Sequence, residues 1–191
     1  MKLAEVVNKI GTSDVLLTEG RSLFGRLIQG RTHSRFSHAG LLVWIHAERS
    51  PPSLAIVEAL DWVGVRLYPI EKYLRDCAQR GECVHWFAVT DQALNREAAA
   101  SFALSWWGNR YANWQQFAAS FARWSRPLWK IIGLKDADTD PFRWHCSELV
   151  ASSLLFGGYR PPDGDEAKPW RITPGHVALF TCLQRRGVLE L

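Results

Sequence analysis

Cys146 is the residue of this chain whose surroundings best suit nucleophilic chemistry. It follows His145 in the stretch FRWHCSELVASS and stands at the predicted start of a helix. The exposed N–H groups of a helix start stabilise a thiolate, which is the reactive form of a cysteine. Apolar residues between Leu149 and Leu155 anchor the buried side of this helix, so its first turn points outward. We therefore predict that Cys146 is a nucleophile, whereas burial as a small apolar residue is the simple interpretation of Cys77, Cys83 and Cys182.

A thiol nucleophile requires a general base, and His38 is the best placed of the six histidines. It begins a predicted strand directly after a polar loop, and it is followed by Ala39 and Gly40, small residues that allow another backbone to approach closely. His145 is adjacent to Cys146, but consecutive residues at a helix start point in different directions, so it is poorly placed to bond the sulfur. Surface or core positions are the simple interpretation of the others, His33, His46, His85 and His176.

A third group must orient the imidazole, and Glu58 in the run LAIVEAL is the candidate. It is a carboxylate in an otherwise apolar strand, which is predicted to lie next to the strand of His38, and a buried acid needs a partner. Asp61 is close enough in sequence to compete for this role. A zinc site would need three or four convergent ligands, and the sequence has no HxH or HxxxH spacing. We therefore expect no metal and no cofactor.

The length and composition predict one folded domain, or at most one domain with an appended lobe, and we expect residues 1–191 to form a single domain. A hydrophobic content of 47% is enough for a core, and the net charge of +4 comes from scattered arginines, without the dense basic blocks that indicate nucleic-acid binding. Four cysteines without a CxxC pair favour neither a zinc ribbon nor a disulfide framework. The start MKLAEVVNKI lacks the apolar run of a signal peptide, and no stretch is long enough to span a membrane, so we expect a cytoplasmic protein.

The pattern of apolar residues alternates between helical and strand-like periods. It predicts helices over residues 3–10, 21–30, 70–80, 91–107, 114–124 and 146–155, and a further helix that begins at Pro174 with Thr173 as its N-cap. It predicts strands within 12–20 and over 38–47, 54–60, 62–70, 82–90 and 187–191, with a break at ERSPPS. Alternation along these strands is incomplete, so both faces of the sheet are expected to be partly covered. The sum is an α+β domain, in which helices flank a small and mostly antiparallel sheet.

Tryptophan is unusually frequent, with ten residues, and several of them lie in an aromatic-rich segment of about residues 106–134 that is predicted to be helical. Aromatic residues at helical spacing most often belong to a core. Here they occupy more than one face, since Trp106 and Trp107 are consecutive, and they alternate with basic residues. Such a face also suits peripheral contact with a membrane surface or the cover of an acyl-chain groove.

Six motifs occur in an order and spacing that resemble a known enzyme family: SDVLLTEG, FSHAGLLV, IVEAL, GNRYANW, WHCSELVAS and ITPGHVA. The chain resembles the circularly permuted papain-like enzymes of the NlpC/P60 superfamily, specifically the YiiX/YaeF-like group related to lecithin:retinol acyltransferase. The resemblance runs from about Ser13 to Ala178. In that family the histidine precedes the cysteine, as His38 precedes Cys146 here. Ser13 is a departure, because many relatives have glycine before Asp14; we expect it to alter a turn and not the chemistry.

The resemblance implies a permuted papain-like fold with Cys146 as nucleophile, His38 as base and Glu58 as the orienting carboxylate. Tyr111 matches a family tyrosine, and we expect the backbone N–H of Cys146 to stabilise an oxyanion, with Tyr111 or His145 assisting.

The function expected from these residues is that of a cysteine-dependent hydrolase or acyltransferase that cleaves an amide or ester through a thiol acyl-enzyme. Its substrates would be peptide-type amides, including cell-wall peptides, or lipid-linked acyl groups. The alternative is a non-catalytic module that keeps the fold and binds a lipid or peptide through the aromatic segment.

Overall fold

A single antiparallel sheet organises the chain in the computed structural model, which describes residues 1–21, 29–30, 33–60, 63–109, 145–161, 169 and 172–191. Its six strands are β1 (Val15–Glu19), β2 (His38–Ala47), β3 (Ser50–Leu60), β4 (Gly64–Pro69), β5 (Cys83–Val89) and β6 (Leu183–Leu189), in the spatial order β4-β3-β2-β1-β5-β6. All five pairings between these strands are antiparallel. The α+β architecture with a small antiparallel sheet is therefore confirmed.

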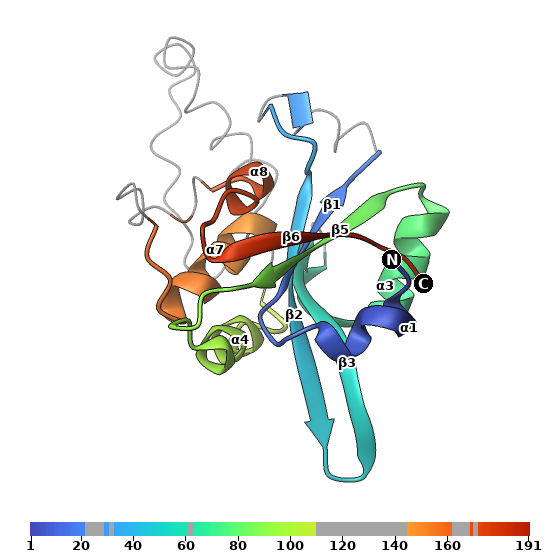
Figure 1. Cartoon of the computed structure of the whole chain (residues 1–191), viewed down its shortest axis with the longest axis vertical. Coiled ribbons are helices and arrows are strands. Elements are labelled where there is room, and N and C mark those ends of the chain that lie inside the picture. Colours follow the sequence, from blue (N-terminus) through green and yellow to red (C-terminus); the bar gives the residue numbers. More distant parts are fainter. Residues whose placement is uncertain (22–28, 31–32, 61–62, 110–144, 162–168, 170–171) are drawn as a thin grey trace.

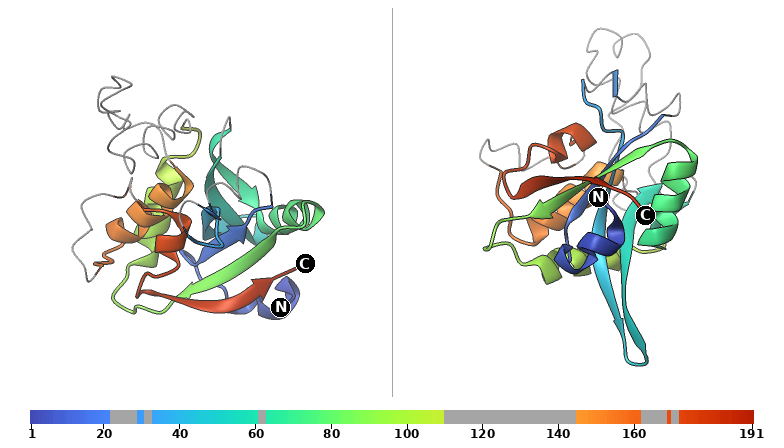
Figure 2. Two further views of the ribbon diagram at one scale, coloured as in Figure 1. Left: turned by 90° about the horizontal axis from the view of Figure 1, so that it is seen from above. Right: turned by 45° about the vertical axis from the view of Figure 1, so that its right-hand side comes forward.

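Helices cover both faces of this sheet, as Figures 1 and 2 show. The helices α1 (Leu3–Val6), with its 3-10 continuation at Val7–Lys9, and α3 (Ile70–Gln79) pack on one face; α4 (Arg96–Ser105), α7 (Cys146–Phe156) and α8 (Pro174–Val177) pack on the other. A hydrophobic core therefore lies on each face of the sheet, and alternate residues of a strand belong to different cores. In β2, Leu41 and Val43 face α4 and α7, whereas Leu42 faces α3. This double burial explains the incomplete alternation of the sequence.

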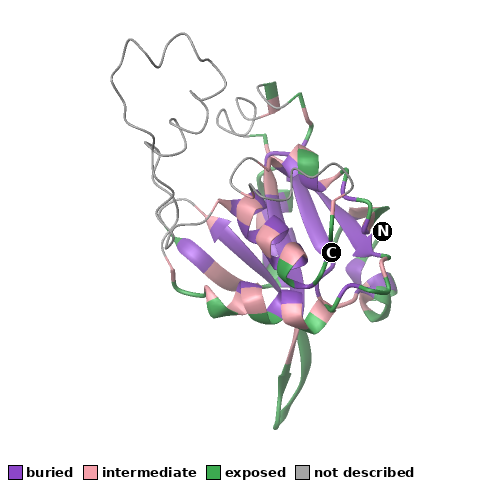
Figure 3. Cartoon of the chain, turned by 90° about the vertical axis from the view of Figure 1, so that its left-hand side faces the viewer, coloured by how far each residue is buried: buried purple, intermediate pink, exposed green. Residues whose placement is uncertain are grey.

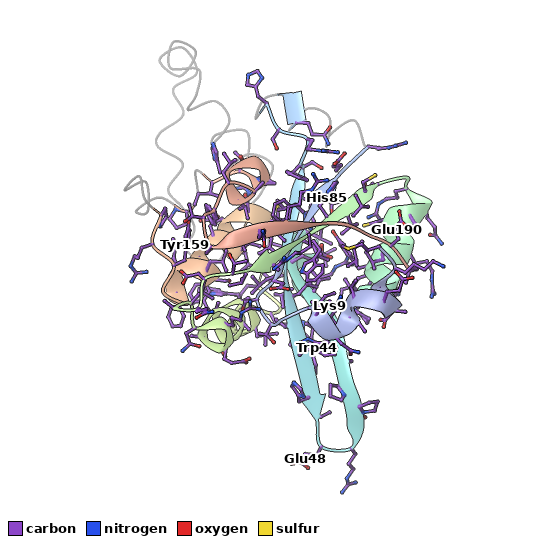
Figure 4. The ribbon with its side chains drawn as sticks, in the orientation of Figure 1. Lys9, Trp44, Glu48, His85, Tyr159 and Glu190 are labelled. Carbon is purple, nitrogen blue, oxygen red and sulfur yellow. The ribbon has the colours of Figure 1, made fainter. Side chains whose placement is uncertain are left out.

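The hairpin of β2 and β3 extends well beyond its neighbours, with Glu48 near its end (Figures 1 and 4). The expected break at ERSPPS is therefore shorter than predicted, because β2 continues to Ala47 and β3 already begins at Ser50. Pro51 and Pro52 fit in β3 because the register with β2 is interrupted between Ile45 and Ala47, and because β4 pairs with β3 only from Ala55 onward. Figure 3 shows this end of the hairpin as exposed.

The turn before β1 is fixed by Asp14, a carboxylate that is only 1% exposed. Asp14 accepts hydrogen bonds from the backbone N–H groups of Gly11 (3.0 Å) and Val89 (2.9 Å), from Trp86 Nε1 (2.8 Å) and from Arg96 Nη1 (3.1 Å). These contacts give Asp14 a structural role, because they tie the turn to β5 and to Arg96 at the start of α4.

Ser13, the departure from the family pattern, has a φ of +67°, a conformation that favours glycine. Its hydroxyl donates to the backbone oxygen of Arg96 at 2.6 Å, which fastens the turn to the start of α4. Ser13 therefore takes part in a turn, and that it alters this turn relative to the resembled family stays a prediction.

Most predicted elements recur with shifted ends. The helix predicted from residue 91 begins at Arg96, because the side chain of Asn95 caps it by accepting from the N–H of Ala98 at 3.0 Å. Thr173 caps α8 as predicted, but this helix is only four residues long. The final strand begins at Leu183, before the predicted start. The helices predicted over 21–30 and 114–124 fall largely or wholly outside the described residues.

Candidate active site

Cys146 is the first residue of α7, and the helix behind it is fixed in the core. Leu149, Val150 and Leu154 are fully buried against the sheet and α4. The hydroxyl of Ser147 donates to the backbone oxygen of Ile172 at 2.6 Å, which ties the first turn to the segment before α8. Cys146 itself is buried, with 8% of its surface exposed, although the sequence pattern predicted that this turn points outward. Its position at the start of the helix agrees with the prediction.

His38 begins β2, and its ring is held by Glu58 on the neighbouring strand β3. Its Nε2 lies 2.6 Å from Glu58 Oε2, and because a carboxylate only accepts, Nε2 carries the proton of this bond. The ring also hydrogen-bonds Cys146, and Nδ1 is the nitrogen left for that contact. The structure thus brings together the cysteine, the histidine and the acid, which lie far apart in sequence.

Glu58 is buried to 1% exposure, and its charge is compensated on both oxygens. Oε2 faces His38, and Oε1 accepts from Arg66 through Nε at 2.9 Å and Nη2 at 2.7 Å. Burial raises the pKa of Glu58, but the bonds and charges of His38 and Arg66 outweigh it, so the pKa lies below its ordinary value. Glu58 is therefore a carboxylate at neutral pH.

The electrostatics of Cys146 and His38 favour a thiolate beside an imidazolium. Burial raises the pKa of the thiol, but the charge and hydrogen bond of His38 lower it, together with bonds from the backbone N–H groups of Ala39 and Ser147, and the pKa lies below its ordinary value. Burial lowers the pKa of His38, yet the charges and bonds of Cys146 and Glu58 raise it to about 10. A thiolate in this pair is nucleophilic at neutral pH.

The small residues after His38 serve two different purposes. Ala39 offers its N–H to the sulfur, which agrees with the predicted close approach of a second element to this backbone. Gly40 makes room within the sheet: an added Cβ would lie 2.4 Å from Ile56 Cδ1 and 3.3 Å from the oxygen of Val57. At Gly40 the closely approaching group is thus mainly the side chain of Ile56 on β3, and not the backbone that the sequence analysis expected.

His145 precedes α7, and the carboxylate of Glu148 accepts from its backbone N–H at 3.3 Å. Burial lowers the pKa of His145 to about 4, so its ring is neutral at pH 7. Burial also raises the pKa of Glu148 to about 7, against the effect of the His145 N–H. A role for His145 in oxyanion stabilisation stays a prediction.

Three predicted features lie wholly or mostly outside the described residues. Tyr111 is two residues beyond Asn109, the last described residue before the gap, whose backbone oxygen accepts from the N–H of Val65 of β4 at 2.8 Å. Of the aromatic segment only residues 106–109 are described, and Trp107 is 64% exposed. Asp61, the competitor of Glu58, is also outside the described part.

His85 belongs to a separate polar cluster and not to the site. Its Nε2 lies 2.5 Å from Glu19 Oε1, and Arg185 Nη2 donates to Nδ1 at 3.0 Å. His176 helps to close the start of α8, where its Nδ1 accepts from the N–H of Thr173 at 3.2 Å. These contacts agree with the structural interpretation of both histidines.

Arg66 is the residue of the site that the sequence analysis missed. It lies directly opposite Glu58 in the antiparallel pair of β3 and β4. A hairpin between β3 and β4 in which Leu60 pairs with Gly64 also pairs Glu58 with Arg66. The sequence suggested such a hairpin, but its turn residues did not fix the strand register, so this pair could not be predicted.

Comparison with known proteins supports the fold. No family model matches the sequence, and no curated protein matches it. The structure is similar to the crystal structure of the metalloprotein yiiX from Escherichia coli O157:H7 (DUF1105), with a TM-score of 0.62 and 18% sequence identity over 95% of this chain and 99% of that chain. The predicted likeness to YiiX is therefore confirmed at the level of the fold.

The residues described here do not fit a metal site. They include no group of three or more histidine, cysteine, aspartate or glutamate side chains arranged to hold a metal ion. Nor does the described part of the chain contain a helix of the length and hydrophobicity needed to cross a bilayer.

Proposed function

We propose that the chain is a cysteine-dependent hydrolase or acyltransferase that acts on an amide or ester through a thiol acyl-enzyme, on a permuted papain-like fold of the NlpC/P60 type. The observation that carries this proposal is the line of contacts from Cys146 through His38 to Glu58. The order of these residues and the fold shared with yiiX support it.

In the first half of the reaction, the thiolate of Cys146 attacks the substrate carbonyl carbon. A C–S bond forms and the carbonyl electron pair moves to oxygen. The N–H of Cys146 is in the first turn of α7, where N–H groups lack intrahelical acceptors, and is suited to bind that oxygen. When the oxyanion collapses, the bond to the leaving amine or alcohol breaks and His38 gives that group its proton.

In the second half, water or an acceptor amine or alcohol attacks the thioester. His38 takes the proton of the attacking group, the C–S bond breaks, and the sulfur leaves as a thiolate. Glu58 keeps the imidazole in the orientation and tautomer that both transfers need.

The test is the pH dependence of Cys146 alkylation by iodoacetamide, followed by mass spectrometry of each cysteine peptide. We expect fast modification of Cys146 at pH 6–7 and an apparent thiol pKa below the ordinary value of about 8.5. Cys77 and Cys182 are internal controls, because burial raises the pKa of each to about 12. An ordinary value for Cys146, or faster labelling at another cysteine, contradicts the proposal and favours a binding module.

A second measurement addresses the acyl-enzyme itself. Brief incubation with p-nitrophenyl acetate should add an acetyl group to Cys146, with release of one equivalent of p-nitrophenol. The variant Cys146→Ser should lose the adduct, because its hydroxyl is far less nucleophilic at neutral pH. Acetylation of this variant to the same extent as the unsubstituted chain would show that a residue other than Cys146 is acetylated.

A further inference from the structure

Arg66 makes contacts that single it out among the charged residues of β4. Two of its nitrogens donate to Glu58 Oε1, at 2.9 Å and 2.7 Å, while Oε2 of the same carboxylate faces His38 at 2.6 Å. Each oxygen of Glu58 therefore has its own partner. This division leaves the carboxylate no freedom to rotate away from His38 without breaking bonds to Arg66.

Burial makes the charge of Glu58 costly unless it is compensated. A carboxylate with 1% exposure loses nearly all its hydration, and a bond to His38 alone would compensate only one oxygen. Two other titratable groups, Tyr73 and Cys77 on α3, are influenced by the charge of Glu58. Burial raises the pKa of Tyr73 well above its ordinary value and that of Cys77 to about 12, so both are neutral near pH 7. Neither supplies a positive charge.

Arg66 is itself held in place by β4 and α3. Its guanidinium lies 3.9 Å from the ring centroid of Tyr68, the next residue on the same face of β4. The hydroxyl of Tyr68 donates to Asp76 Oδ2 at 2.7 Å, which fixes the ring against α3. An arginine fixed in this way is preorganised for the carboxylate.

We propose that Arg66 is a positioning residue of this site, which keeps Glu58 ionised and aligned on His38 through its two bonds to Oε1. The inference rests on the proposed function, since it concerns the reactivity of Cys146. Arg66 acts through Glu58, whose charge stabilises the imidazolium, which in turn stabilises the thiolate.

The consequence is a specific change in the pH profile. Without Arg66, Glu58 takes up a proton at a higher pH, and the imidazolium loses its counterion over the acidic part of the profile. The thiolate is then lost at a higher pH. At pH 8, where Glu58 is ionised in either case, reactivity changes little.

The experiment measures Cys146 alkylation from pH 4 to 9 in the full chain with Arg66→Met and Arg66→Lys. For Arg66→Met we expect the acidic apparent pKa of the profile to rise by about one unit, which is about a tenfold lower rate on that limb. Arg66→Lys keeps the positive charge but replaces the two donating nitrogens by one, so we expect a smaller rise of the acidic apparent pKa. Arg186→Met, on the exposed part of β6, controls for the loss of one positive charge.

The double variant Glu58→Gln/Arg66→Met separates positioning from a direct charge effect. In the Glu58→Gln background, Arg66→Met should shift the acidic limb no further, because the residue through which Arg66 acts is already neutral. An equal shift in both backgrounds, or no shift in Arg66→Met, overturns the inference while the proposed function stands. An ordinary thiol pKa in the unsubstituted chain overturns the proposed function, and this inference with it. Thermal unfolding checks each variant; if Arg66→Met does not fold, Arg66→Lys decides by the same comparison.

Discussion

The site depends on a few buried charges whose partners decide whether they are tolerated. Glu58 has compensation on both oxygens, and His38 stands between two negative groups, the thiolate and the carboxylate. A buried charge without such partners would shift its pKa and neutralise. The residues therefore form one electrostatic unit, and changing any member should alter the titration of the others.

At the same scale, His38→Gln should abolish the stabilisation of the thiolate. Glutamine can still hydrogen-bond Glu58 but carries no positive charge, so the pKa of Cys146 should rise to its ordinary value or above. We expect the alkylation rate of Cys146 at pH 6 to fall at least about tenfold. His46→Gln, at an exposed position farther along β2, is the matched control. A low thiol pKa in His38→Gln would show that the helix start alone stabilises the sulfur.

At the scale of elements, the hairpin of β2 and β3 sets the distance between His38 and Glu58. Gly40 allows the two strands to pack with Ile56, which is fully buried, directly beside the backbone of β2. On the other face, α7 packs against β2 and β3 and brings its first residue to the start of β2. The two strands and the helix thus position one side chain each, and the site forms only where these three elements meet.

Gly40→Ala should therefore destabilise the fold by overpacking. The new Cβ would lie 2.4 Å from Ile56 Cδ1, and we expect the free energy of unfolding to fall by about 1–3 kcal/mol. Ile56→Val removes that Cδ1 atom and should cost less in the Gly40→Ala background than in the native chain. Urea unfolding of the four proteins measures the coupling. Gly30→Ala, where an added Cβ meets nothing within 4 Å, is the control; simple additivity of the pair would contradict the packing argument.

At the scale of the whole molecule, one sheet carries two cores, and the site joins positions that are distant in sequence. The chain visits β2 and β3 early and reaches α7 only after β5 and α4. Global unfolding must therefore dismantle the site, and groups buried near it should appear in the pH dependence of stability. Glu148, in the first turn of α7, is such a group.

Glu148 should make the folded chain less stable as the pH rises through neutrality. Its folded pKa of about 7 exceeds the ordinary 4.5 because of burial, so between these values the folded chain keeps a proton that the unfolded chain has released. The free energy of unfolding then falls with increasing pH across this window and levels off above it. Glu148→Gln keeps the acceptor for His145 and should remove a decrease in the free energy of unfolding of about 3 kcal/mol across the window.

Urea unfolding at pH 5, 6, 7 and 8 measures this slope. Glu97→Gln, an exposed substitution in the first turn of α4, controls for the loss of one acidic group. A slope in Glu148→Gln equal to that of the native chain would show that Glu148 titrates as an ordinary surface acid.

Local pattern predicted much of the fold and part of the site. Periodicity located α3, β5 and α7 within a few residues, because one-sided burial imposes a repeat on the sequence. It erred at β3, where the prolines at positions 51 and 52 look like a break although they lie in a strand with a free edge. The start of such a strand depends on which of its backbone groups the neighbouring strands pair with.

By itself, the sequence determined which residue types are available and where a thiol meets a helix start, since both are local properties. It also indicated His38 as the base. Only the tertiary structure decided that Glu58 is the acid bound to that histidine, that Arg66 compensates its charge, and that the N–H of Ala39 reaches the sulfur. The physical reason is that these contacts cross strands and layers, so they depend on register and packing that no short stretch of chain encodes.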